Sequence, residues 1–179
     1  MHGAKQVVVT DYPDADLIAN IEHNITANRE HLQISGHPNI IAEGYLWGAP
    51  PAKLTTHLPA ASQRFDLLVL ADILFNHSQH EALLSTVQQT LSTSVDAQAL
   101  VFFTPYRPWL YDKDMAFFDL ARAGGFVVEK VLEEVMDAVM FPEDRGDEML
   151  RRKVFGYALK WKREEEWREN AEADVGPLN

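Results

Sequence analysis

The sequence predicts an α/β fold built on a parallel, doubly wound sheet with one antiparallel strand near its C-terminal end. Two short apolar runs, residues 65–70 and 99–103, are typical of buried parallel strands, the first covered on both faces. Predicted strands and helices alternate along most of the chain, which favours a parallel sheet. The last two predicted strands follow each other directly, and this order indicates a hairpin that inserts one antiparallel strand.

The first half of the chain is assigned from local patterns. The run Val7–Val9 indicates a strand that stops at the turn residues after it. Leu17, Ile21 and Ile25 follow helical spacing, and acidic residues stand near the expected helix start. The remaining predictions are a loop over residues 35–39, a second strand over 39–45 and an irregular, proline-containing stretch over 49–63.

The second half is assigned in the same way. The third strand leads into a loop over residues 72–77, and Ser78 and Glu81 predict a capping box at the next helix start. Residues 1–162 are expected to form one domain and residues 163–179 a polar tail. The other predicted elements are a helix with the apolar stripe Leu84, Val87 and Leu91, a strand over 99–103, a helix over 112–123 ending at two glycines, and strands over 126–135 and 153–162.

Composition excludes several classes of function. The net charge of −11 argues against a nucleic-acid partner, which needs clustered lysine and arginine. The chain has no cysteine, so disulfides and thiolate chemistry are excluded. No apolar run approaches the roughly 20 residues of a membrane span. The seven histidines show no metal-binding spacing. We therefore expect a cytoplasmic protein without a membrane partner or a metal.

Candidate site residues follow the predicted strands, because ligands of open α/β sheets bind at the carboxyl ends of the strands. Asp11 follows the first strand and is either a ribose-binding acid or an acid that starts a helix or forms a turn. Trp47 follows the second and either borders an adenine or is an ordinary core or surface aromatic residue. Asp72 follows the third and either positions an amine or forms a turn. His77 is either a base or a neighbour of the helix cap.

Several segments resemble one known family. They are GAKQVVVTDYPD (residues 3–14), GYLWG (44–48), ADILFNHS (71–78), PYRP (105–108) and the region 126–161. Together they are similar to the fungal nicotinamide N-methyltransferase-like group of S-adenosylmethionine-dependent methyltransferases. Members of this group methylate the N-terminus and a nearby lysine of translation elongation factor 1-alpha. The resemblance covers nearly the whole chain.

The resemblance implies a Rossmann-like, seven-stranded methyltransferase sheet and a role for each matching residue. Asp11 would hold the ribose of S-adenosylmethionine, and Trp47, together with Tyr12, would border its adenine. Ala71 would lie beside the methyl donor. Asp72 and Phe75 would shape the acceptor site as its catalytic residues. The implied protein substrate is elongation factor 1-alpha.

One departure from the family pattern affects this expectation. The family places its first strand and a glycine-rich loop just before the segment that starts at Gly3, and neither is found in this sequence. The sheet is therefore expected to lack its first strand, which would expose the edges of two neighbouring strands. Two alternative functions stay open: a catalytically inactive protein that binds a partner, and an enzyme that methylates a small amine such as nicotinamide.

Overall fold

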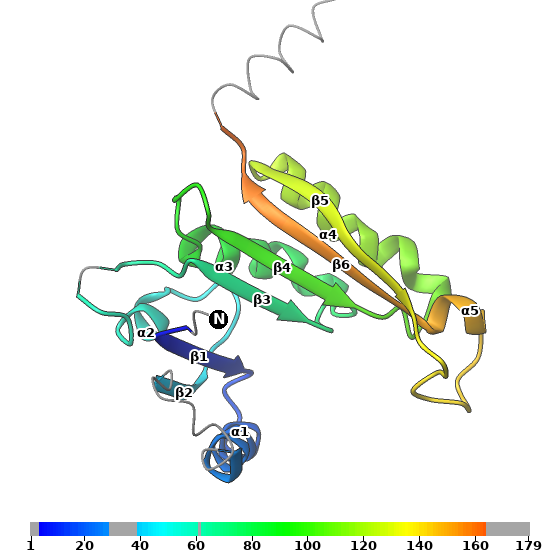
Figure 1. The fold of residues 1–179 in the computed structure, drawn as a ribbon, viewed down its shortest axis with the longest axis horizontal. Helices are drawn as coiled ribbons and strands as arrows, with labels where there is room; N and C mark the ends of the chain where they lie inside the picture. The colour runs from blue at the N-terminus through cyan, green and yellow to red at the C-terminus, as the bar shows by residue number, and fades with distance from the viewer. Residues whose placement is uncertain (1–3, 29–38, 61, 164–179) are drawn as a thin grey trace, which may run out of the picture.

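The computed structural model describes residues 4–28, 39–60 and 62–163, which form two separate sheets (Figure 1). The smaller sheet contains the first two strands and the larger one contains the other four. The elements in chain order are β1 (Gln6–Asp11), α1 (Ala15–Asn28), β2 (Asn39–Gly44), α2 (Ala52–Thr55), β3 (Leu67–Ala71), η1 (His77–Gln79), α3 (His80–Thr90), β4 (Gln98–Phe103), η2 (Pro108–Leu110), α4 (Tyr111–Ala123), β5 (Phe126–Val135), α5 (Glu148–Arg151) and β6 (Lys153–Trp161).

The larger sheet has the strand order β3-β4-β6-β5. β3 and β4 are parallel, whereas β6 runs antiparallel to both of its neighbours. The predicted antiparallel strand near the C-terminal end is therefore confirmed.

Glu133 on β5 is bonded to Lys130 and, at 2.6 Å, to Lys153 on β6. These two hydrogen bonds lower the pKa of Glu133 to about 2.

The smaller sheet pairs β1 and β2 in parallel, from Gln6 opposite Asn39 to Asp11 opposite Gly44. It joins the larger sheet through the segment after β2. There the backbone N–H of Gly48 donates to the Thr86 hydroxyl on α3 at 2.8 Å. Gly48 has a φ of +80°, and a Cβ at this position would lie 3.3 Å from that of Ala82. A glycine is therefore needed for this backbone to approach α3 closely.

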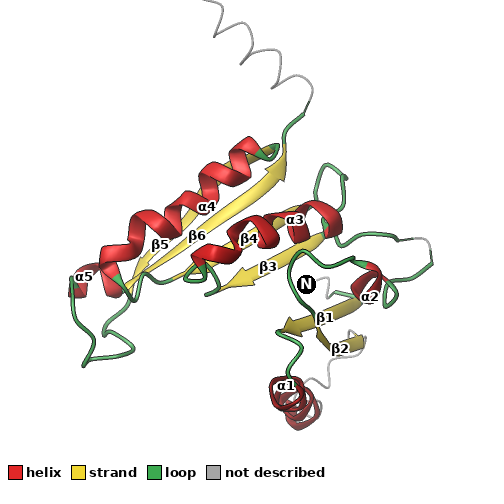
Figure 2. Cartoon of the chain, turned by 180° about the vertical axis from the view of Figure 1, so that it is seen from behind, coloured by secondary structure: helices red, strands yellow, loops and turns green. Residues whose placement is uncertain are grey.

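Helices α3 and α4 cover one face of the larger sheet, which is the face seen in Figure 2. The core lies between them and the strands, and three phenylalanines, Phe117, Phe118 and Phe126, are fully buried there. The opposite face is bare among the described residues, so Leu67 and Val69 on β3 are 50% and 60% exposed. The prediction that this strand is covered on both faces is wrong, because both helices pack on the same side.

Two of the local predictions differ from the structure in kind. The stretch expected to be irregular contains the short helix α2. The predicted capping box does not form, because the η1 turn over His77–Gln79 shifts the start of α3 to His80. The Ser78 hydroxyl instead donates to the side chain of Asn76 at 3.2 Å.

None of the described helices is long and apolar enough to cross a membrane. Residues 35–38 of the expected loop and 164–179 of the expected tail lie outside the described residues.

Candidate active site

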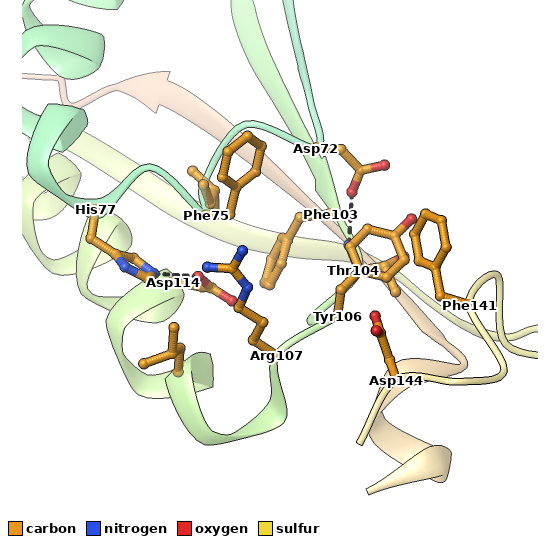
Figure 3. A pocket seen from close by; sticks show the side chains of 12 residues that line it. Asp72, Phe75, His77, Phe103, Thr104, Tyr106, Arg107, Asp114, Phe141 and Asp144 are labelled. Carbon is orange, nitrogen blue, oxygen red and sulfur yellow. Dashed lines mark hydrogen bonds and ion pairs between the residues drawn. The ribbon is translucent and has the colours of Figure 1, made fainter. Parts of the chain in front are cut away.

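A pocket of about 290 Å³ lies beyond the carboxyl ends of β3 and β4 (Figure 3). Its walls come from the loops after these two strands, from α4 and from the loop between β5 and α5. This is the edge where sheets of this class bind ligands. The lining residues are Asp72, Leu74, Phe75, His77, Phe103, Thr104, Tyr106, Arg107, Leu110, Asp114, Phe141 and Asp144.

Asp72 connects the loop after β3 to the loop after β4. Its backbone N–H donates to the carbonyl of Phe102 at 2.8 Å, and its Oδ1 accepts the N–H of Thr104 at 3.0 Å. Asp72 also has a φ of +52°, a left-handed conformation that aspartate tolerates better than most residues. One carboxylate oxygen is thus fixed by the backbone. The other has no hydrogen-bond partner among the described residues, so it is available to a ligand.

His77 ties the loop that carries Asp72 and Phe75 to α4. Its Nε2 donates to Asp114 Oδ1 at 2.7 Å, and the Asp114 side chain is only 9% exposed. Burial raises the pKa of Asp114, and the hydrogen bond from His77 opposes this shift. The His77 ring meets His80 edge-on, and buried His80 donates from Nε2 to the carbonyl of Leu74 at 2.8 Å. These contacts hold the loop against the helix. His77 is therefore a link between loop and helix, and its alternative role as a base stays a prediction.

The pocket combines aromatic walls with an excess of acidic groups. Tyr106 and Phe141 meet edge-on with ring centres 5.5 Å apart, and Phe75 is 64% exposed at the surface. Burial, together with the charge of Asp72, raises the pKa of the Tyr106 hydroxyl. Three carboxylates and one guanidinium, that of Arg107, line the pocket. Aromatic faces and carboxylates attract an amine or ammonium group. The described residues contain no cluster of metal-ligating side chains.

The residues predicted to bind the donor do not line this pocket. Asp11 is exposed at the end of β1, where its Oδ1 accepts the N–H of Tyr12 at 2.7 Å, and Tyr12 is exposed as well. Trp47 is half-buried and packs against the core of the larger sheet. Ala71 is the exposed last residue of β3. The structure therefore brings Asp72 and Phe75 into one pocket and leaves the donor-binding roles as predictions.

Sequence reasoning missed part of the pocket. Asp114 could have been found, because it shares a helical stripe with Phe117, Phe118 and Ala121 and so falls on the buried face of α4. A buried carboxylate on an apolar helix stripe needs a hydrogen-bond or charge partner, and such groups occur often at functional sites. Phe141 and Asp144 lie in the long connection between β5 and β6. No local pattern there indicates that they reach the carboxyl ends of β3 and β4.

Comparisons with known proteins identify the family. The model of the lysine methyltransferase family matches residues 1–123. The chain is 45% identical over 159 residues to the protein N-terminal and lysine N-methyltransferase efm7 of Aspergillus fumigatus, covering 89% of this chain and 61% of that protein. It is 41% identical over 158 residues to efm7 of Schizosaccharomyces pombe, covering 88% of this chain and 60% of that protein.

The chain thus spans about three fifths of the length of these curated relatives. Among solved structures, the PH0226 protein from Pyrococcus horikoshii OT3 is 13% identical with a TM-score of 0.48, covering 88% of this chain and 72% of that one. That likeness is too low to support an argument. The family model, which matches residues 1–123, shows that the chain belongs to the lysine methyltransferase family.

Proposed function

We propose that this chain is part of an S-adenosylmethionine-dependent protein N-methyltransferase that acts in the cytoplasm. Its acceptor is the N-terminal amine, a lysine amine, or both, of translation elongation factor 1-alpha. One observation carries this proposal. In a chain of the lysine methyltransferase family, the pocket beyond β3 and β4 presents the Asp72 carboxylate, fixed by the Thr104 N–H at 3.0 Å, beside aromatic walls.

The pocket suits an amine that must lose its proton before it accepts a methyl group. The donor supplies a methyl group on a sulfonium, and the acceptor nitrogen must be neutral and held in line with it. A lysine amine has a reference pKa near 10.4 and an α-amino group one near 8. Phe75 and Tyr106 remove water from the amine, which lowers its pKa, while the Asp72 carboxylate orients the amine and by its charge favours the protonated form. The amine gives its proton to Asp72 or to solvent before its lone pair attacks the methyl group, and the sulfonium leaves as a neutral thioether. The α-amino group is the easier acceptor because its reference pKa is lower.

The donor's ribose end fits Asp11. Its exposed carboxylate stands at the carboxyl end of β1, and the Tyr12 N–H fixes one of its oxygens at 2.7 Å. In Figure 1 the arrowheads of β1 and β3 point the same way, so the carboxyl end of β1, where Asp11 stands, is on the same side as the carboxyl end of β3, where the pocket lies. We further propose that in the complete enzyme another strand lies between β1 and β3. Within the described residues, β1 and β3 each have one edge without a strand partner, and this observation and the greater length of the curated relatives support the proposal.

The first test is calorimetric titration of the 179-residue chain with S-adenosylhomocysteine. Binding in the micromolar range, about −8 kcal/mol, would support a donor site that works in this chain. A chain that melts cooperatively but does not bind would favour the inactive, partner-binding alternative for this sequence. In that case the experiment is repeated on the chain with its upstream genomic sequence.

The second test follows transfer of tritiated methyl groups to elongation factor 1-alpha and, separately, to nicotinamide. Transfer to the protein alone is expected; transfer to nicotinamide alone would overturn the proposed acceptor. The variant Asp72→Ala should lose transfer while keeping its fold. Asp96→Ala, an exposed acid at the opposite end of β4, is the matched control and should transfer normally. Unchanged transfer by the Asp72 variant would remove this residue from the mechanism.

A further inference from the structure

The loop between β5 and α5 presents an unusual surface beside the pocket. Met136 and Met140 of the loop and Met149 of α5 are exposed, Met140 by 69%. Trp109 on η2 is exposed by 63% and lies against Gly146 of the same loop. Clustered exposed apolar side chains are typical of interaction surfaces, and methionine adapts its shape to a partner. We call residues 136–149 together with Trp109 the docking rim.

The docking rim is held in place by hydrogen bonds that its backbone makes with α5 and the residues beside it. Arg151 is only 6% exposed, and its Nη1 donates to the carbonyl of Phe141 at 2.8 Å. Arg152 accepts the N–H of Met136 at 2.8 Å and donates from Nε to the same residue's carbonyl at 2.6 Å. Asp147 caps α5 by accepting the N–H of Leu150 at 3.2 Å. A surface fixed in this way loses little conformational freedom when it binds.

The charge of the docking rim is strongly negative. Residues 136–149 contain five acids, at positions 137, 143, 144, 147 and 148, and one arginine, at position 145, which gives a net charge of −4. None of these acids forms an ion pair within the described part of the chain. The rim therefore repels a second copy of itself and any anionic surface such as nucleic acid or lipid. It attracts a basic protein surface.

The docking rim is continuous with the pocket. Phe141 and Asp144 belong to both, and the hydroxyl of Tyr106 in the pocket wall contacts the Met140 sulfur at 3.7 Å. The rim therefore forms one side of the pocket. We propose that the rim docks a basic, partly apolar surface of the protein acceptor, next to the amine that is methylated. This inference rests on the proposed function and adds a second contact outside the pocket.

The test measures binding of the 179-residue chain to purified fungal elongation factor 1-alpha, by surface plasmon resonance at about 50 mM and about 300 mM salt. The rim variant is Asp137→Lys with Glu143→Lys, two exposed acids outside the pocket. The control, Asp66→Lys with Asp96→Lys, makes the same charge change in exposed acids at the amino ends of β3 and β4. A third variant, Met149→Ser, tests the apolar part.

We expect the rim variant to bind about tenfold or more weakly at low salt, mainly through slower association, and the difference to shrink at high salt. The control should stay within about twofold of the parent chain, since its charges lie far from the rim. Met149→Ser should dissociate faster with little change in association rate, because it removes apolar contact rather than charge. Equal losses in rim variant and control, or no binding by the parent chain, would overturn the inference.

Methyl transfer separates this inference from the proposed function. If elongation factor 1-alpha is methylated while the rim variant binds it as tightly as the parent chain, the rim proposal fails and the function stands. If binding depends on the rim but no transfer occurs under any condition, the rim stands and the proposed function fails. Asp72→Ala provides the internal check, because it should abolish transfer while its binding keeps the same dependence on salt that the rim confers.

Discussion

The hydrogen bond between His77 and Asp114 should contribute measurably to stability, because it joins the pocket loop to α4. The bond is 2.7 Å long, and its acceptor is a carboxylate with only 9% of its side chain exposed. A hydrogen bond to a charged group contributes about 1.5–3 kcal/mol net. His77 is 25% exposed, so solvent weakens the pair. We therefore expect a coupling free energy of about 2 kcal/mol between the two side chains.

A double-mutant cycle measures this coupling directly. His77→Ala, Asp114→Ala and the double variant are unfolded with urea at neutral pH, and the coupling is the part of the double loss that the single losses do not explain. Asp119→Ala with Arg122→Ala is the control cycle, since this exposed pair on α4 should couple by less than about 1 kcal/mol. A coupling below about 0.5 kcal/mol for His77 and Asp114 would refute the reasoning that the bond holds the loop.

Three further predictions concern the elements around the site. Gly156→Ala should lower the free energy of unfolding by about 1–3 kcal/mol in urea titration, because its Cβ would lie 2.7 Å from the Phe102 ring and 2.8 Å from Leu132. Glu133→Gln should lower the melting temperature slightly at neutral pH. The pKa of Glu133 is depressed from 4.5 to about 2, so its contribution is present above pH 4.5 and is lost as the pH falls toward 2, where variant and parent should melt together. Asp147→Ala should lower the free energy of unfolding by about 1 kcal/mol and speed hydrogen exchange of the Leu150 amide, which Asp147 caps. Unchanged exchange at this amide would exclude the cap.

The fold was predictable where local pattern and layer order agree. The runs at residues 67–71 and 98–103 are strands, and the two last strands do form an antiparallel pair. The covering of the sheet was not predictable, because an apolar run shows which residues avoid water but not which element shields them. Leu67 and Val69 illustrate this limit: they have the composition of a buried strand and yet lie on the bare face. The division into two sheets, with β1 pairing only with β2 among the described residues, was not predictable either. It depends on which strands pair, and no local pattern specifies that.

The candidate site was predictable in part for a related reason. Asp72 and Phe75 follow a strand directly, so the rule that ligands bind at carboxyl ends points to them. Asp114 lies on α4, which packs beside this edge. Phe141 lies in the loop between β5 and α5, and its carbonyl accepts a hydrogen bond from Arg151. Their positions depend on tertiary packing rather than on spacing in the sequence. The part of a site that comes from strand ends is therefore the part that a sequence reveals.

The arrangement of the pocket suggests that acceptor and donor binding can be separated in this protein. Every residue that lines the pocket lies between positions 72 and 144, after the smaller sheet has ended, and its support is the core beneath α3 and α4. Asp11 instead depends on β1, which forms no hydrogen-bonded ladder with the larger sheet among the described residues. A change in the pocket should therefore alter acceptor binding and leave donor binding unchanged. A change at Asp11 should alter donor binding and leave acceptor binding unchanged. Under the proposed function, the acceptor pocket rests on the larger sheet, whereas the proposed donor contact of Asp11 rests on the smaller one.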